Sequence, residues 1–193
     1  MQKTSDSGLG VGASLHRKED ARHLFGRGQY VSDLKFPKMR EVAFVRSSVA
    51  HGKIVQINIP VEHRKCVFVA ADFEDVLPLY AVCSIPGWKH SECHGLAVDK
   101  VLFVGQPIAM CVARTRDEAE DIVQSIEVEY EELPPVVDML AALQPDAPVL
   151  HEGWSNNLYI QKDFEAGDIE SARQAAEVVV RREYRMNRQA GVP

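Results

Sequence analysis

The side chains best suited to metal binding are gathered in one short, irregular stretch of the sequence. His90, Cys93 and His94 place three potential ligands within five residues, in the segment IPGWKHSECHG. A structural zinc site needs a fourth ligand and usually shows the paired spacings of zinc motifs. The stretch offers no such set, so we expect no metal site in this chain.

Other patterns that would carry chemistry are missing from the sequence. It contains no G-x-S-x-G and no H-E-x-x-H. Gly8, Gly10 and Gly12 do not form G-x-G-x-x-G, and no strand-like run precedes them, so they do not indicate a nucleotide site. His51 is followed by Gly52, and a loop histidine of this kind is more often a solvated turn residue than a base. The sequence therefore predicts no catalytic, cofactor-binding or metal-binding residue.

Composition narrows the class of protein. The 193 residues are 46% hydrophobic and 26% charged, which is ordinary for a globular chain that can bury a core. Asp and Glu number 28 against 22 Lys and Arg, giving a net charge of -6, so we expect no nucleic-acid partner. No apolar run approaches the ~20 residues of a membrane span, and the N-terminus lacks a secretion signal. We expect a cytoplasmic protein with no membrane span.

The spacing of the four cysteines does not indicate a metal or redox motif. They have no C-x-x-C spacing, and two of them lie in strand-like apolar runs, where a reduced thiol behaves as a small hydrophobe. We expect four free thiols, at Cys66, Cys83, Cys93 and Cys111.

The element that organises the chain is residues 101–131. Two apolar runs, 101–104 and 108–113, flank Gly-Gln-Pro, which predicts two strands around a tight corner. Thr115 and Glu118 form a capping-box pattern, so a helix should start there. An apolar stripe with helical spacing then gives way at Ile126 to strict alternation, typical of a strand with one buried face. The unit reads as strand, corner, strand, helix, strand.

Shorter elements surround this unit, and Trp88 lies in a loop where it could be a surface anchor or a cap on the core. We expect strands at 41–46, 54–59, 66–69 and 178–186, a short helix or turn at 71–76, a short helix at 139–143 capped by Asp138, a long loop at 145–157 with Trp154, and a helix capped by Asp168.

Five segments, in order, resemble the start of the large subunit of the molybdenum hydroxylases, the family of xanthine dehydrogenase, aldehyde oxidase and carbon monoxide dehydrogenase. Residues 17–22 (RKEDAR) and 26–33 (GRGQYVSD) are similar to the opening pattern of bacterial members. Residues 43–47 (AFVRS), 50–54 (AHGKI) and 104–109 (VGQPIA) are similar to later signatures. The last of these, through its glutamine, favours the carbon monoxide dehydrogenase branch.

The resemblance implies an α+β fold, the α/β hammerhead domain, with a mixed sheet and a few packed helices. It also implies a parent oxidoreductase that carries molybdopterin, with a glutamate base further along the large chain and partner subunits holding iron-sulfur clusters and FAD. By the family's sequence pattern, none of these catalytic and cofactor-binding residues lies within the 193 residues of this chain. The resemblance therefore implies no cofactor in this fragment.

We therefore expect three regions and two competing functions. The regions are a flexible N-terminal arm (1–13), the hammerhead domain (14–186) and the start of a link to missing molybdenum-binding domains (187–193).

The leading hypothesis is a non-catalytic structural fragment, inactive by itself, whose partners are the rest of the large subunit and the iron-sulfur and FAD subunits. The alternative is a stand-alone binding module that keeps the fold without redox activity. A small hydrolase or metalloenzyme has little support.

Overall fold

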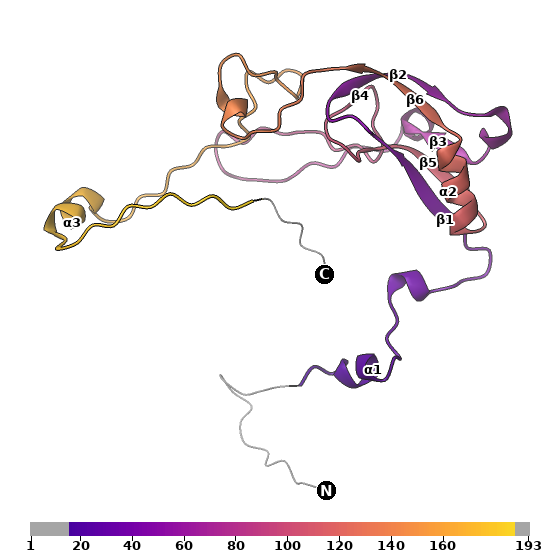
Figure 1. Ribbon diagram of the computed structural model, residues 1–193, viewed down its shortest axis with the longest axis horizontal. Helices are drawn as coiled ribbons and strands as arrows, with labels where there is room; N and C mark the ends of the chain where they lie inside the picture. The colour runs from indigo at the N-terminus through magenta and orange to yellow at the C-terminus, as the bar shows by residue number, and fades with distance from the viewer. Residues whose placement is uncertain (1–15, 188–193) are drawn as a thin grey trace, which may run out of the picture.

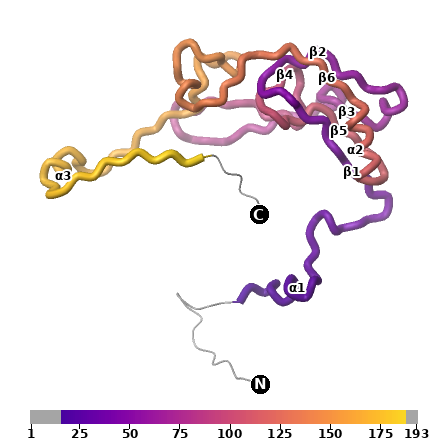
Figure 2. The backbone as a smooth tube through the Cα atoms, in the orientation of Figure 1, coloured from indigo at the N-terminus to yellow at the C-terminus, as the bar shows by residue number. Residues whose placement is uncertain are grey.

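The computed structural model describes residues 16–187 of the chain (Figure 1). The expected N-terminal arm at 1–13, its three glycines, and all but the first residue of the expected link at 187–193 lie outside the described residues. Three parts are distinguished below: the N-terminal segment (16–40), the sheet body (41–160) and the C-terminal segment (161–187). Figure 2 shows both segments running away from the sheet body.

The sheet body is built from two three-stranded sheets. The first has the order β1 (Glu41–Arg46), β5 (Pro107–Ala113), β3 (Val67–Val69), and the second has the order β4 (Lys100–Val101), β2 (Gly52–Asn58), β6 (Glu127–Glu132). The chain is thus α+β, as the sequence predicted.

Every strand pair in these two sheets is antiparallel, so the expected mixed sheet is wrong. Parallel strands need a long crossover, usually a helix, and helices then cover the sheet. In the described part of the chain only one helix packs on a sheet, and antiparallel pairing needs none.

That helix is α2 (Arg116–Gln124), which packs against β1 and β5 (Figure 1). It starts where the sequence predicted: the Thr115 hydroxyl accepts a hydrogen bond from the Glu118 amide at 3.2 Å. The Glu118 carboxylate accepts from the amide of Arg114 at 3.1 Å, one residue before the position that a capping box requires. Ala119 and Ile122 are buried, which confirms the predicted apolar stripe.

The core consists of two adjoining clusters, and α2 contributes residues only to the first. Both are packed against the partly buried Ile57 and Val128, which join one sheet to the other. The buried members are Val45, Val67, Ala109, Cys111, Ile122 and Ile126 in the first cluster, and Ala97, Val101 and Ile108 in the second.

The remaining elements are short. The helices are α1 (Asp20–Leu24) and α3 (Ile169–Ala175), and the 3-10 turns are η1 (Val31–Asp33), η2 (Val61–His63), η3 (Ala70–Phe73) and η4 (Ala141–Leu143). The predicted strand at 101–104 is cut to two residues, because Gly105 turns the chain with a φ of +88°. The predicted helix at 139–143 is only η4, although Asp138 accepts hydrogen bonds from two of the amides that follow it.

The prediction of a strand at 178–186 is wrong for this structure. The backbone there forms no sheet pairing, and every residue from 161 to 187 is exposed. Because a strand is stabilised by hydrogen bonds to a neighbour and by a covered face, a β-rich sequence without either stays extended and unpaired.

Candidate functional site

Two of the sequence motifs meet in space at the corner between β4 and β5. The Ser47 amide donates to the Gln106 carbonyl at 2.9 Å, and the Gly105 amide donates to the Ser47 carbonyl at 2.8 Å. The Arg46 guanidinium donates to the Gly105 carbonyl at 2.8 Å, and the Gln106 side chain accepts from the Leu102 amide at 2.7 Å. These four bonds satisfy the polar groups of a tight turn, so the motif residues hold a structural junction.

His51 lies at a second junction, and the prediction that it is a solvated turn residue is wrong. It is only 7% exposed, and its Nδ1 lies 2.9 Å from the Pro134 carbonyl. The His51 carbonyl also accepts from the Leu133 amide at 2.9 Å. The ring therefore links the start of β2 to the chain leaving β6, and a buried, bonded ring of this kind has no access to a substrate.

Gly52, next to His51, sits where no side chain fits easily. A Cβ there would lie 3.2 Å from the Glu131 carbonyl oxygen and 3.2 Å from a methyl of Val49. Glycine suits this position because β2 and β6 approach closely here. The motif around His51 thus serves strand packing.

The three candidate metal ligands point to different neighbours. His90 stacks edge-on with Tyr80, Cys93 pairs its backbone with Leu79, and the His94 ring lies 3.2 Å from the Glu92 carboxylate. Within residues 16–187, no three His, Cys, Asp or Glu side chains are placed to share a metal ion. All four cysteines are free.

An aromatic cluster joins the 80s loop to the 150s loop. The rings of His151 and Trp154 lie 4.4 Å apart, and Trp154 meets Tyr159 edge-on at 4.6 Å. Trp88 lies 5.8 Å from Tyr159, and Lys89 sits over the Trp154 ring at 5.1 Å. Both tryptophans are half-buried, so they fasten one loop to the other.

His151 has the only clearly perturbed imidazole among the described residues. Burial lowers its pKa, and the positive charge of Lys100 lowers it further. Its Nε2 lies 3.3 Å from the Tyr159 hydroxyl. A neutral ring held among aromatic neighbours suits packing between loops.

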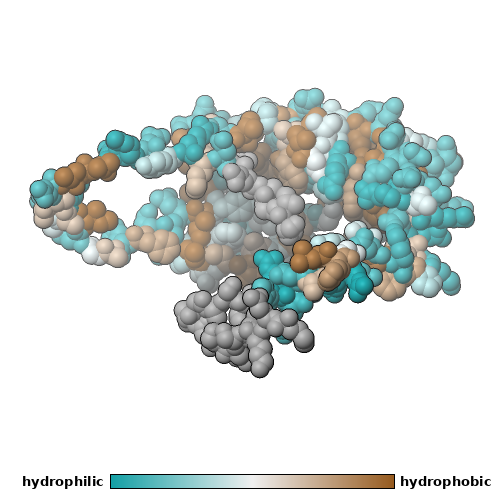
Figure 3. All heavy atoms as spheres, turned by 60° about the horizontal axis from the view of Figure 1, so that its bottom comes forward, coloured by the Kyte–Doolittle hydropathy of each residue, from teal (hydrophilic) through white to brown (hydrophobic). Residues whose placement is uncertain are grey.

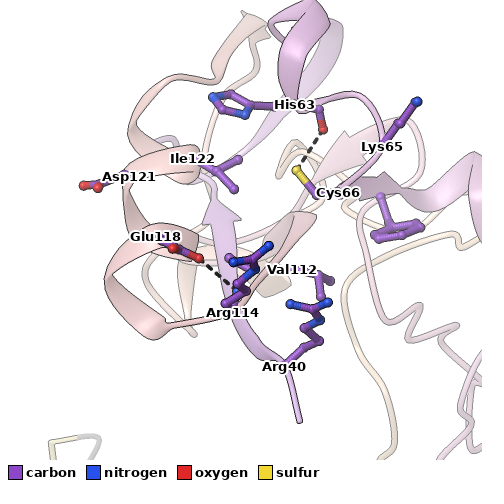
Figure 4. A pocket seen from close by; sticks show the side chains of 11 residues that line it. Arg40, His63, Lys65, Cys66, Val112, Arg114, Glu118, Asp121 and Ile122 are labelled. Atoms are coloured by element: carbon purple, nitrogen blue, oxygen red, sulfur yellow. Dashed lines mark hydrogen bonds between the residues drawn. The ribbon is translucent and has the colours of Figure 1, made fainter. Parts of the chain in front are cut away.

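A hollow with a volume of about 630 Å³ lies beside α2 (Figure 4). Its basic side chains come from three places in the sequence, and no motif signalled it. They are Arg40, His63, Lys65 and Arg114, and the other lining residues are Cys66, Phe68, Val112, Ala113, Glu118, Asp121 and Ile122.

Exposed apolar side chains mark both flanking segments. In Figure 3, brown side chains follow the protruding C-terminal segment. Those exposed by more than 70% in the two segments are Leu24, Phe25, Val31, Phe164, Ile169, Val178, Val180, Tyr184 and Met186. Isolated exposed apolar residues are normal, but a contiguous series marks an interaction surface.

The described residues thus define a small α+β domain whose sequence motifs serve strand junctions and whose flanking segments expose apolar side chains among charged ones. Residues 25–134 match the family described as aldehyde oxidase and xanthine dehydrogenase, a/b hammerhead domain. This chain belongs to that family. The match confirms the resemblance and fold class predicted from the sequence.

Known proteins agree with this assignment. The chain is 40% identical over 141 residues to the carbon monoxide dehydrogenase large chain of Hydrogenophaga pseudoflava, covering 70% of this chain and 17% of that one. It is 33% identical over 195 residues to subunit gamma of the 6-hydroxypseudooxynicotine dehydrogenase complex of Paenarthrobacter nicotinovorans, covering 95% and 24%. A solved Cu,Mo-CO dehydrogenase superposes with a TM-score of 0.62 at 36% identity, covering 77% and 19%. The chain therefore spans about a fifth of the length of these relatives.

No helix among residues 16–187 is long and apolar enough to cross a bilayer.

Proposed function

We propose that this chain acts as a non-catalytic hammerhead domain within the large subunit of a molybdenum hydroxylase, nearer the carbon monoxide dehydrogenase type than the xanthine dehydrogenase type. Its partners are then the remaining domains of that subunit and, through them, subunits that carry iron-sulfur clusters and FAD. The family membership supports a molybdenum hydroxylase as the parent enzyme. One relative is subunit gamma of a dehydrogenase complex, which supports the existence of partner subunits. Free cysteines support a cytoplasmic parent.

In this proposal the C-terminal segment packs against the remaining domains of the large subunit, which is its docking role. The observation that supports this role is the exposure of the segment. Phe164 is 84% exposed and Val180 is 72% exposed, and α3 buries no residue. Domains of one chain meet through contacts of roughly 600 to 1,500 Å². A segment with β-branched and aromatic residues but no covering partner is suited to lie in such a contact.

The described residues do not fit molybdopterin itself. The resemblance implies that glycine-rich loops bind that cofactor in the family, and no glycine lines the large hollow beside α2. Among the described residues, every buried polar side-chain atom already has a hydrogen-bond partner, so none is left unpaired to bind a cofactor group. We propose that other domains of the parent enzyme hold its molybdopterin.

The test mixes the 193-residue chain with the separately expressed remainder of the parent's large subunit, followed by size-exclusion chromatography. We expect one co-eluting peak at micromolar concentrations. Phe164→Asp combined with Val180→Asp should abolish it, because both substitutions put charge on the uncovered C-terminal segment. Val61→Asp is the matched control, since Val61 is 88% exposed but lies on the sheet body. It should co-elute like the wild type.

The same preparation tests whether the domain is catalytically inert. The chain alone should not oxidise aldehydes, purines or carbon monoxide. Turnover of any of these, or failure of the wild type to associate, would contradict the proposal. If the reading frame also ended at Pro193, the stand-alone binding module would become the better explanation.

A further inference from the structure

The hollow beside α2 has a basic mouth over an apolar floor. Arg40 precedes β1, Arg114 follows β5, His63 ends η2, and Lys65 lies in the loop between η2 and β3 (Figure 4). Its volume of about 630 Å³ falls in the range of small-molecule sites, about 300 to 1,000 Å³. The floor is formed by the apolar members of the lining, Cys66, Phe68, Val112, Ala113 and Ile122.

The two arginines are neighbours across the sheet. Glu41 pairs with Ala113 in the β1–β5 ladder, so extending the register by one residue sets Arg40 opposite Arg114. Like charges in such positions repel and destabilise a sheet. Within the described chain, none of Arg40, Arg114 and Lys65 has an ion-pair partner within 4.0 Å. In a chain with a net charge of -6, three cationic side chains without an ion-pair partner thus meet at one hollow.

The two acids that line the hollow form no ion pair with these cations within 4.0 Å. The Glu118 carboxylate accepts the Arg114 backbone amide at 3.1 Å and so belongs to the cap of α2. The Asp121 side chain points away from both arginines in Figure 4.

The walls of the hollow are held in place by backbone bonds. The Val112 amide donates to the Cys66 carbonyl at 2.8 Å, which ties the loop before β3 to β5. The Cys66 thiol donates to the His63 carbonyl at 3.2 Å (Figure 4). On the other side, Arg116 of α2 donates to the Val42 carbonyl of β1 at 2.8 Å. The cationic groups therefore project from a fixed frame, which lowers the entropy cost of binding.

We propose that this hollow binds a small organic phosphate monoester with an apolar body. Paired guanidinium groups match the forked oxygens of a phosphate. The apolar floor takes the organic part, so inorganic phosphate alone should bind more weakly. The proposal stands independently of the docking role, because it uses residues of the sheet body and none of the C-terminal segment.

The test titrates the 193-residue chain with 1-naphthyl phosphate, 1-naphthol and inorganic phosphate while following backbone amide shifts by NMR. We expect saturable shifts at Ala113 and Arg114 with 1-naphthyl phosphate. Its Kd should be at least about tenfold lower than that of either half-molecule, since charge-assisted bonds and apolar burial both contribute. Raising the ionic strength should weaken its binding.

Two variants and a matched control assign the effect. Arg40→Gln and Arg114→Gln should each raise the Kd about tenfold, as expected for loss of a charge-assisted bond. Arg64→Gln removes the same charge from an exposed neighbour that does not line the hollow, and it should change the Kd less than about twofold.

A gain-of-binding variant guards against misfolding. Glu118→Gln keeps an acceptor for the Arg114 amide but removes a negative charge, so it should tighten binding by about twofold or more. Equal binding of 1-naphthol and 1-naphthyl phosphate would overturn the proposal. So would an Arg64→Gln effect as large as that of Arg114→Gln, or weaker binding in Glu118→Gln.

Discussion

Helices α2 and α3 begin alike and end up in different surroundings. Each starts at a side-chain cap: Thr115 accepts an amide hydrogen bond at 3.2 Å and Asp168 accepts one at 2.9 Å. α2 then buries Ala119 and Ile122 against the sheets, whereas α3 buries no residue. Local capping thus defines where a helix starts, and only the sheet body supplies a surface on which it can pack.

The same contrast separates the sheet body from both flanking segments. Among residues 16–187, the buried apolar residues all lie between Ala43 and Ile126. Every residue from 161 to 187 is exposed, and so are all but two of residues 16–40. The free energy of unfolding should therefore come from the sheet body, with the flanks contributing little until something covers them.

The largest difference should appear between two isoleucines. Ile108 is fully buried, so Ile108→Ala should lower the free energy of unfolding by about 2 to 5 kcal/mol through lost burial and a cavity. Ile169 on α3 is 73% exposed, and Ile169→Ala should stay within about 0.5 kcal/mol of the wild type. Urea unfolding followed by circular dichroism measures both. Equal midpoints would show that α3 packs on the sheet body in solution.

Thiol reactivity should separate Cys111 from Cys93 nearly as strongly. Burial, and to a smaller extent the nearby Cys66 and Glu120, raise the pKa of the Cys111 thiol from 9.0 to about 11. The raised pKa means that at pH 9 only about one Cys111 in a hundred is a thiolate, the form that reacts. Cys93 is exposed. Iodoacetamide at pH 9, with mass-spectrometric mapping, should label Cys93 at least about tenfold faster. Comparable rates would mean that the core opens readily.

Two glycines offer a test of intermediate size. Gly52→Ala should cost about 1 to 3 kcal/mol, because the new Cβ meets the Glu131 carbonyl between β2 and β6. At Gly95 a Cβ meets nothing within 4 Å, so Gly95→Ala should be neutral or slightly stabilising. Thermal unfolding of the two variants in parallel would decide. A neutral Gly52→Ala would show that the strands can separate there without cost.

The smallest expected effect compares the two helix caps. Thr115→Ala should lower the free energy of unfolding by about 1 kcal/mol, because α2 is part of the cooperative unit. Asp168→Ala removes the same kind of bond from α3, yet it should leave the global unfolding midpoint unchanged and reduce only local helicity. Chemical denaturation and NMR shifts of residues 169–175 give the two readouts. A shift of the midpoint in Asp168→Ala would join α3 to the sheet body.

The sequence predicted the features that depend on near neighbours. The Thr115 cap, the stripe through Ile122 and the corner at Gly105 each arise within a few residues, where spacing decides the structure. The family resemblance supplied the fold class, which periodicity alone could not.

Features that depend on distant partners escaped the sequence. His51 is buried because Pro134, 83 residues further on, offers its carbonyl. Likewise, Arg40 and Arg114 become neighbours only through the register of β1 and β5. The extended form of residues 178–186 reflects the lack of a strand beside them among the described residues. Pairing, burial and charge clustering are tertiary properties, and a local pattern does not contain them.

The pairing of β2 with β6 has a consequence for how the domain forms during synthesis. Lys53 and Glu131 bond across 78 residues, and Arg116 reaches Val42 across 74. Contacts between residues so far apart in the sequence form slowly, because closing the long loop between them costs conformational entropy before the contact can stabilise the fold. As the chain leaves the ribosome, β1 and β3 must wait unpaired until β5 emerges, and β2 has only the two-residue β4 as a partner until β6 emerges. The nascent domain is therefore a candidate chaperone client over this stretch of translation.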